Sequence, residues 1–193
     1  MKKTLVTIFW LLLFASASFA DMVDNRLPLA TPEELKASTR QMIGLGIKSD
    51  EAVKITRAML QNHFNLEQIL KAQLIVMQAR RQNLPTKPIV NKAFEGMAKD
   101  VMDEKIVRAM EVVRSRYAFA YAQAKLLSHQ KARKSHLEKM LAGALTAGLS
   151  KQDAAKICNM VNEKAENVSN EQQNDLAFEV LKTARDMARL SVT

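Results

Sequence analysis

A strip of cationic and phenolic side chains in the middle of the sequence is the feature best suited to chemistry. Arg114, Tyr117, Tyr121 and Lys125 follow one another at steps of three and four residues, which place side chains on one face of a helix. Such a face attracts anionic groups, and the phenols add hydrogen-bond donors. The residues of this candidate site are Arg114, Arg116, Tyr117, Tyr121, Lys125, Lys131, Arg133 and Lys134.

The charge of the chain supports this candidate, because the excess of positive charge is local. The whole chain has 29 Lys and Arg against 20 Asp and Glu, a net charge of +9. Between residues 105 and 139, nine basic residues stand against two acidic ones. The expected partner is a protein or an anionic envelope component, such as a lipid headgroup or a cell-wall polyanion. The alternative interpretation is a solvated helix face with Tyr117 packed inward, because charged helix faces are common.

No other set of residues predicts a metal, cofactor or catalytic site. His129 and His136 are seven positions apart, which is about 10 Å along a helix and too far for one zinc ion. Many of the acidic residues fall in expected first turns of helices, where the helix dipole favours negative charge. All five glycines are isolated, so no phosphate-binding loop is predicted. We therefore expect a protein that has no cofactor and is not an enzyme.

Residues 1–20 have the three-part organisation of a secretory signal peptide. Two lysines precede an unbroken apolar run at 5–14 and small residues follow, so cleavage is expected between Ala20 and Asp21. The alternative is an uncleaved anchor, but the segment falls short of the roughly 20 apolar residues that span a membrane. We expect a periplasmic or secreted protein with no transmembrane segment after cleavage. Export also argues against nucleic acid as the partner of the basic strip.

Cys158 is the only cysteine, which excludes a disulfide within one chain. Ala154, Ile157 and Val161 share a helical face with it by their spacing. The favoured interpretation is a buried, unreactive thiol, because free cysteine behaves as a small hydrophobic residue. Pairing with a second chain is the alternative.

The elements that position all these residues are predicted to be helices. The sequence is rich in Ala, Leu, Met, Lys, Glu and Gln, and its apolar residues recur at helical spacing. Capping residues mark the expected helix starts, and Pro85 and Pro88 mark the clearest break. The expected caps are Thr31, Ser49, Asn65, Asp103, Ser135, Ser150 and Ser169. The fold class is therefore all-α, with about eight helices arranged as stacked helical hairpins.

An internal repeat is predicted by two similar segments, 44–55 and 147–157, which lie 102 positions apart. A weaker similarity, at a spacing of 37, relates the residues that follow Phe64 to those that follow Val101. The alternative is an irregular bundle whose helices have similar caps because every helix needs one.

The domain organisation follows from these patterns. Residues 21–30 are expected to form a flexible leader, and 31–193 a single all-helical domain. The predicted internal repeat divides this domain into two similar lobes, 31–82 and 135–190, joined by 86–132.

Together these features predict an exported, non-enzymatic helical interaction module that binds a protein or an anionic envelope component through its basic segment. The alternative is a periplasmic chaperone that holds unfolded clients in a methionine-rich groove, because methionine side chains adapt to varied partners. The chain has 11 methionines. An enzyme is a third hypothesis, which no residue pattern supports.

Overall fold

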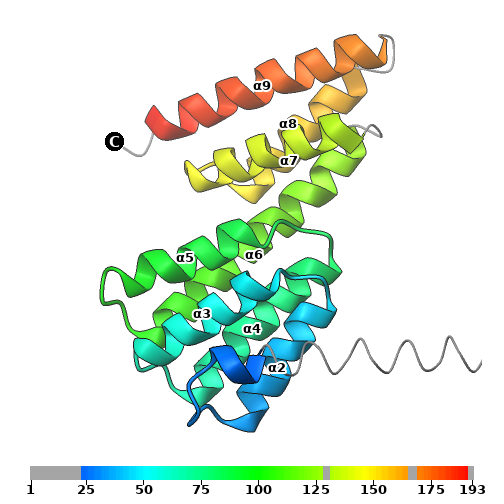
Figure 1. Ribbon diagram of the computed structural model, residues 1–193. Coiled ribbons are helices and arrows are strands. Elements are labelled where there is room, and N and C mark those ends of the chain that lie inside the picture. Colours follow the sequence, from blue (N-terminus) through cyan, green and yellow to red (C-terminus); the bar gives the residue numbers. More distant parts are fainter. Residues whose placement is uncertain (1–22, 128–130, 165–168, 191–193) are drawn as a thin grey trace, which may run out of the picture. The chain divides into compact units, whose positions relative to one another are not determined.

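The protein folds into helices over the residues that its computed structural model describes, which are 23–127, 131–164 and 169–190. A helical turn at 23–26 comes first. The longer helices follow in this order: α2 (Glu33–Gly44), α3 (Ser49–Gln61), α4 (Leu66–Arg81), α5 (Lys87–Met97), α6 (Asp103–Leu127), α7 (Lys131–Thr146), α8 (Lys151–Lys164) and α9 (Asn170–Leu190) (Figure 1). These described residues contain no strand, and the all-α prediction is confirmed.

The chain divides into two compact units, residues 1–111 and 112–193, and the boundary falls inside α6. It therefore lies within the segment 86–132 to which the sequence analysis assigned the connection between two lobes. The described part of each unit has its own buried apolar core.

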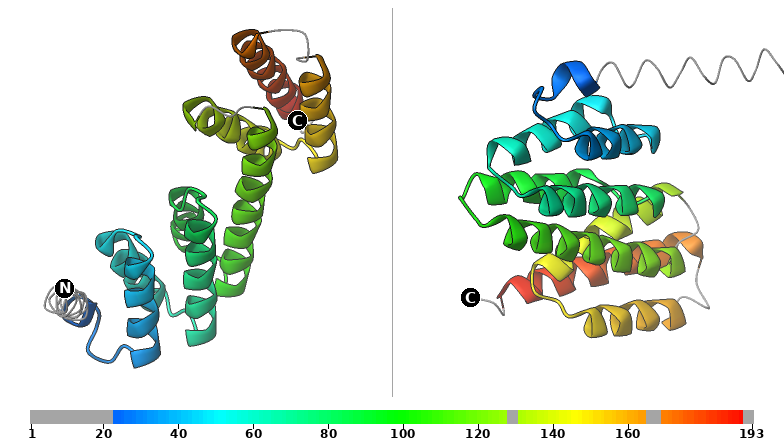
Figure 2. Two further views of the ribbon diagram at one scale, coloured as in Figure 1. Left: turned by 90° about the vertical axis from the view of Figure 1, so that its right-hand side faces the viewer. Right: turned by 90° about the horizontal axis from the view of Figure 1, so that it is seen from below.

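In the first unit, α2 to α5 pack side by side, and α5 also packs on the first half of α6 (Figure 2). Apolar residues one or two turns apart point into the core from each helix. Examples are Leu35 and Met42 of α2 and Ile55 and Met59 of α3, all at most 2% exposed. Burying a side chain of this size contributes about 1.5–3 kcal/mol, so these stripes determine which face of each helix turns inward.

Four turns of the first unit share one backbone geometry. Gly46, His63, Asn83 and Asp100 have positive φ angles of 82°, 57°, 57° and 50°. The residue after each of them donates its amide to a carbonyl five positions earlier, at 2.9 to 3.2 Å. This is the Schellman cap, which gives partners to carbonyls left free at a helix end.

The spacing of these turns repeats along the chain. Gly46 and Asn83 are 37 positions apart, and so are His63 and Asp100. Gly148 in the second unit has a φ of 114° and lies 102 positions after Gly46. Both spacings found in the sequence therefore correspond to the same type of helix ending.

A buried polar cluster joins α2, α3 and α4. The Gln73 amide nitrogen donates to the hydroxyls of Thr39, at 3.0 Å, and Thr56, at 2.8 Å. Each hydroxyl donates in turn to a carbonyl one turn earlier on its own helix. The three side chains are at most 2% exposed. Buried donors need acceptors, so this cluster sets the rotation of three helices about their axes.

In the second unit, four helices enclose the core: α7, α8, α9 and the later part of α6. Leu137 and Leu141 of α7 and Leu181 of α9 are fully buried there. Cys158 belongs to the same core and is 1% exposed, which confirms the prediction of a buried thiol. Burial raises the pKa of Cys158 to about 11, because surroundings of low polarity disfavour the thiolate.

The predicted helix caps at Asn65, Ser150 and Ser169 are confirmed by hydrogen bonds. The Asn65 side chain accepts the amide of Gln68 at 2.9 Å at the start of α4. At the start of α8, Ser150 accepts an amide at 3.0 Å from the third residue after it. Ser169 accepts the amide of Gln172 and donates its own amide back to that side chain, which is the reciprocal capping box.

The caps predicted at Thr31 and Ser49 are wrong, because Pro32 and Lys48 hold the N-cap positions of α2 and α3 and neither helix start has a side-chain cap bond.

The predicted helix start at Ser135 is wrong, because Ser135 lies inside α7, which begins at Lys131. The Ser-x-x-Glu pattern predicted a cap in which Glu138 returns to the helix start. Instead Glu138 is buried, and the leucines that follow it at 141 and 145 continue the apolar stripe of one helix. The chain direction therefore changes between α6 and α7, earlier than the pattern indicated.

The predicted signal peptide, 1–20, and the cleavage site between Ala20 and Asp21 lie outside the described residues. In the described part of the expected flexible leader, Val23 is fully buried, and Asp24 accepts hydrogen bonds from Arg40 at 2.8 and 3.0 Å. This segment is packed onto the first unit. Within the described ranges, no helix combines the length and the apolar character that membrane spanning requires.

Candidate functional site

Seven of the thirteen Lys and Arg residues of the second unit lie on α6 and α7, which run roughly antiparallel to each other. We call the surface around the contact of these helices the α6–α7 face and define it by seven residues. They are Arg114, Tyr117, Tyr121 and Lys125 of α6 and Arg133, Lys134 and Lys139 of α7. Arg116, which the sequence also assigned to the site, lies on the side of α6 away from Tyr121 and Lys125 by its helical spacing. The side chain of Lys131, which the sequence also assigned to the site, lies outside the part of the structure that is described.

Tyr121 and Lys134 form the central contact of this face. The Lys134 ammonium lies 4.6 Å from the centroid of the Tyr121 ring and donates to the phenolic oxygen at 3.4 Å. The electrons of an aromatic ring attract a cation in this position by about 0.5–1 kcal/mol at a partly exposed site. The cation is therefore held in place by a neutral ring, and it forms no ion pair with a carboxylate within the described chain.

Tyr117, one turn before Tyr121 on α6, lies near Glu138, one turn after Lys134 on α7. Tyr117 is half-buried against the core of the second unit, as the alternative interpretation of the strip expected. Burial, with a smaller effect of the Glu138 charge, raises the pKa of Tyr117, so the phenol stays protonated at neutral pH. Tyr117 therefore contributes packing to the face and places a neutral phenol near the carboxyl group of Glu138.

Glu138 is the functional candidate that the sequence analysis missed. It is 8% exposed, and its Oε1 has no hydrogen-bond partner among the described residues. Burial raises its pKa, while the nearby charges of Lys134 and Lys139 act in the opposite direction. The available signal was its position, because Glu138 is the only acidic residue between 112 and 139. The capping interpretation of Ser135 concealed it.

The cations of this face differ from those of the first unit in their partners. Within the described chain, Lys125, Lys134 and Lys139 form no ion pair with a carboxylate. In the first unit, several lysines and arginines are paired with Asp or Glu. The paired cations there include Arg26, Lys36, Arg40, Lys71, Lys92 and Lys99. The three lysines of the α6–α7 face therefore carry positive charge that no ion pair within the described chain offsets.

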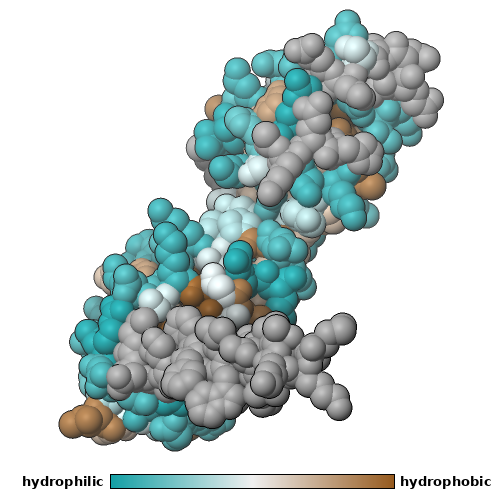
Figure 3. All heavy atoms as spheres, turned by 45° about the vertical axis from the view of Figure 1, so that its right-hand side comes forward, coloured by the Kyte–Doolittle hydropathy of each residue, from teal (hydrophilic) through white to brown (hydrophobic). Residues whose placement is uncertain are grey.

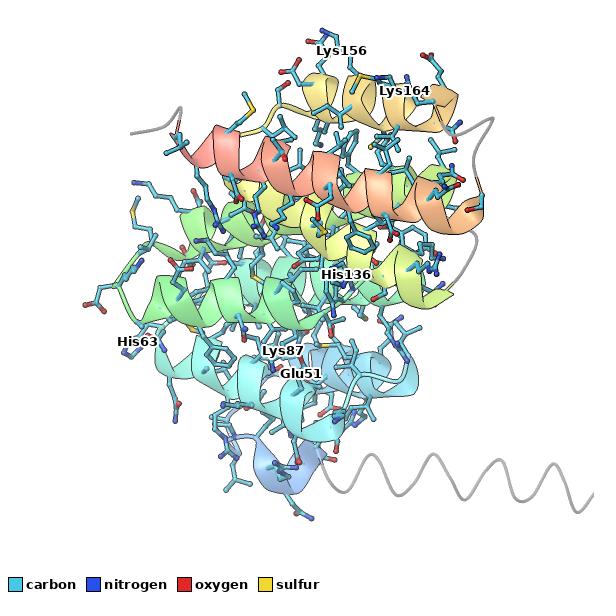
Figure 4. The ribbon with its side chains drawn as sticks, turned by 90° about the horizontal axis from the view of Figure 1, so that it is seen from above. Glu51, His63, Lys87, His136, Lys156 and Lys164 are labelled. Carbon is cyan, nitrogen blue, oxygen red and sulfur yellow. The ribbon has the colours of Figure 1, made fainter. Side chains whose placement is uncertain are left out.

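The histidines do not form a metal site in the described part of the chain, where no group of three or more potential ligands is found. His136 packs edge-on against Phe178 of α9, with ring centroids 4.4 Å apart (Figure 4). His63 lies in the turn between α3 and α4, where its backbone adopts the positive φ. Both histidines thus have structural positions.

Two grooves with apolar floors occur, one in each unit. In the first unit, Leu74, Ile75 and Val107 line a groove of about 490 Å³ between α4 and α6. In the second unit, a groove of about 330 Å³ between α8 and α9 is lined by apolar residues that include Val180 and Met187. The face shown in Figure 3 is mostly hydrophilic, with hydrophobic residues exposed in small groups.

Most of the methionines that the structure describes fill the cores, since Met42, Met59, Met77, Met97 and Met110 are all buried. Three others are exposed. These are Met102, at 61%, Met160, at 42%, and Met187, at 65%.

The fold and the face together define an all-α protein with a basic surface on one helical hairpin. Comparisons of the chain with protein-family models, with curated proteins and with solved structures found no match. Function is therefore argued from the geometry.

Proposed function

We propose that this protein is an exported, non-enzymatic interaction module that binds an acidic protein or another anionic envelope component through the α6–α7 face. The observation that carries the proposal is the positive charge of this face, where Lys125, Lys134 and Lys139 form no ion pair within the described chain. Seven basic residues and a single acidic one lie between 112 and 139. That acid, Glu138, is buried, so it is not presented to a partner.

The fixed position of the central cation also supports binding. Lys134 is held over the Tyr121 ring, so part of the entropy of ordering this long side chain is lost before a partner arrives. An anion approaching the face then meets Lys134 on α7 and Lys125, one turn after Tyr121, on α6. Attraction between exposed charges is screened by salt, so binding of this kind weakens as ionic strength rises.

The experiment that tests the proposal measures binding of the chain from Asp21 onward to two anionic probes. The probes are vesicles of phosphatidylcholine and phosphatidylglycerol in equal amounts, and polyglutamate as an acidic polypeptide. We expect binding to at least one probe that falls about tenfold or more between about 50 and 500 mM salt. Pure phosphatidylcholine vesicles are the control, and binding that is equal in low and high salt contradicts the proposal.

A double charge removal places the binding on the α6–α7 face. Lys125→Gln with Lys134→Gln removes two exposed or half-exposed cations of this face that form no ion pair within the described chain. The matched control, Lys156→Gln with Lys164→Gln, removes the same charge from α8, where Lys156 points away from the other helices (Figure 4). The first pair of substitutions weakens binding and the control pair leaves it unchanged; equal effects would assign the attraction to net charge instead of to this face.

A second candidate function, a periplasmic chaperone, is favoured by the groove between α8 and α9. Ile157, Val180 and Met187 line this groove, and the exposed Met160 lies on α8. Adaptable methionine side chains suit the binding of varied apolar segments. Protection of a chemically denatured test protein from aggregation, lost in Met187→Gln but kept in Lys125→Gln, would favour the chaperone over the basic interaction module.

A further inference from the structure

Glu138 lies where an anionic partner would meet the most positive part of the molecule. It is 8% exposed on α7, one turn after Lys134 and next to Lys139, and Tyr117 of α6 lies opposite. Its Oε1 has no hydrogen-bond partner among the described residues. A buried carboxylate without a donor is costly, so burial raises the pKa of Glu138 at this position.

We propose that Glu138 takes up a proton when an anionic partner binds the α6–α7 face, so that this face binds its partner more tightly as the pH falls. The inference rests on the proposed function, because it concerns regulation of the same site. The proton comes from solvent and joins the Glu138 carboxylate, which converts one negative charge into a neutral carboxylic acid.

The physical reason is that a charged Glu138 opposes binding in two ways. It repels the incoming anion, and it offsets part of the attraction from Lys134 one turn away. An anion on the face adds a negative charge near the carboxylate, so it raises the pKa of Glu138 further above the ordinary glutamate range. By linkage, binding that raises this pKa must itself be strengthened by protons.

The charged and titratable groups that act on Glu138 lie on its own helix and on α6, while α8 and α9 also pack on α7. On α7 they are Lys134 and Lys139, whose charges lower its pKa. On α6 they are Tyr117, which stays neutral, with Arg114 and Tyr121 one turn to either side. Helix α9 packs on α7 through His136 and Gly143, which lie on the far side of the helix from Glu138 by their spacing.

The test compares wild-type protein with Glu138→Gln, which has nearly the same shape and no charge. Dissociation constants for vesicles of phosphatidylcholine and phosphatidylglycerol are measured from about pH 5 to pH 7.5, a range in which the phosphodiester keeps its charge. We expect wild-type protein to bind about three- to tenfold more weakly than Glu138→Gln near pH 7.5 and this difference to shrink as the pH falls toward 5, since one proton changes affinity by at most tenfold per pH unit.

The ratio of the two dissociation constants is the decisive quantity, because all other titratable groups are the same in the two proteins and affect both alike. Glu179→Gln is the matched control, since it removes one exposed carboxylate from α9 in the groove facing α8. Its ratio to wild type stays the same across the pH range. A Glu138→Gln ratio that is also constant overturns the inference.

A second measurement stays informative if Glu138→Gln binds poorly for structural reasons. The enthalpy of vesicle binding by wild-type protein is measured near pH 6.5 in two buffers of different ionisation enthalpy, which reports protons taken up. We expect net uptake that Glu179→Gln retains and that Glu138→Asp, which keeps the titrating group, also retains. No uptake by the wild-type protein overturns the inference alone, whereas no vesicle binding at any pH overturns the proposed function as well.

Discussion

Gly96 marks the closest packing of helices in the first unit, and its replacement by alanine tests that packing. A Cβ atom at Gly96 would lie 2.5 Å from Cγ1 and 2.8 Å from Cδ1 of Ile106, which is 1% exposed on α6. Alanine in a helix is favoured over glycine by about 1 kcal/mol. Overpacking of a well-filled core costs about 1–3 kcal/mol. Two contacts below 3 Å with a buried side chain place the overpacking cost in the upper part of this range, at about 2–3 kcal/mol, so we expect Gly96→Ala to lower the free energy of unfolding by about 1–2 kcal/mol.

The double substitution reverses the sign of this effect. Ile106→Ala by itself costs about 2–5 kcal/mol, because it empties a buried site. It also removes both close atoms, and the nearest remaining atom of that side chain is Cβ, at 3.4 Å. In this background Gly96→Ala stabilises the protein by up to about 1 kcal/mol, since its helix propensity now decides the outcome.

Urea unfolding followed by circular dichroism measures these changes, and hydrogen exchange at α5 assigns them to the first unit. Gly143→Ala in α7 is the control, because its added Cβ meets Arg185 at an ordinary contact distance of 3.7 Å. We expect the control to be stabilising by up to about 1 kcal/mol. A Gly96→Ala protein as stable as wild type, or the same effect of Gly96→Ala with and without Ile106→Ala, would refute the reasoning.

Three further predictions follow from the turns, the thiol and the buried carboxyl. Asp100 and Gly148 both have positive φ, which glycine adopts more easily than other residues. Asp100→Gly therefore stabilises the first unit by about 0.5–1 kcal/mol, and Gly148→Ala destabilises the second unit by about 1–2 kcal/mol. Urea unfolding in which the two substitutions change the stability in the same direction contradicts this. Cys158 in the native protein reacts with a thiol reagent at pH 8 far more slowly than in urea, because it is buried and its pKa is raised to about 11; equal rates would show that the core around it opens readily. Glu138→Gln raises the melting temperature at pH 7 more than at pH 4. Because burial raises the pKa of Glu138 in the folded state, the wild-type protein has its full stability below the pKa of the unfolded state and loses stability as the pH rises through the pKa of the folded state. A difference in melting temperature that does not depend on pH contradicts the burial of Glu138.

Local features of this protein were predictable because they depend on neighbours within a few residues. The caps at Asn65 and Ser150 are examples, since a side-chain oxygen reaches an amide three positions ahead. The spacings of 37 and 102 in the sequence proved to separate equivalent helix endings, such as those at Gly46, Asn83 and Gly148. Burial of Cys158 followed from the apolar residues on its helical face.

The prediction at Ser135 failed for the opposite reason. The same four-residue pattern caps a helix or lies inside one, and only contacts with distant parts of the chain distinguish the two cases. Here the leucine stripe of α7 packs into the core of the second unit, so the helix continues through Ser135.

The candidate site divides in the same way. The sequence by itself determined that the protein is helical and that its positive charge is concentrated between 105 and 139, because propensity, periodicity and composition are local properties. Tertiary structure decided which of these groups meet. The antiparallel packing of α6 on α7 brings Lys134 onto Tyr121 and encloses Glu138 near Tyr117. Burial depends on residues that are far apart in the chain, so the one acid that sets the pH response of this face was visible only in the fold.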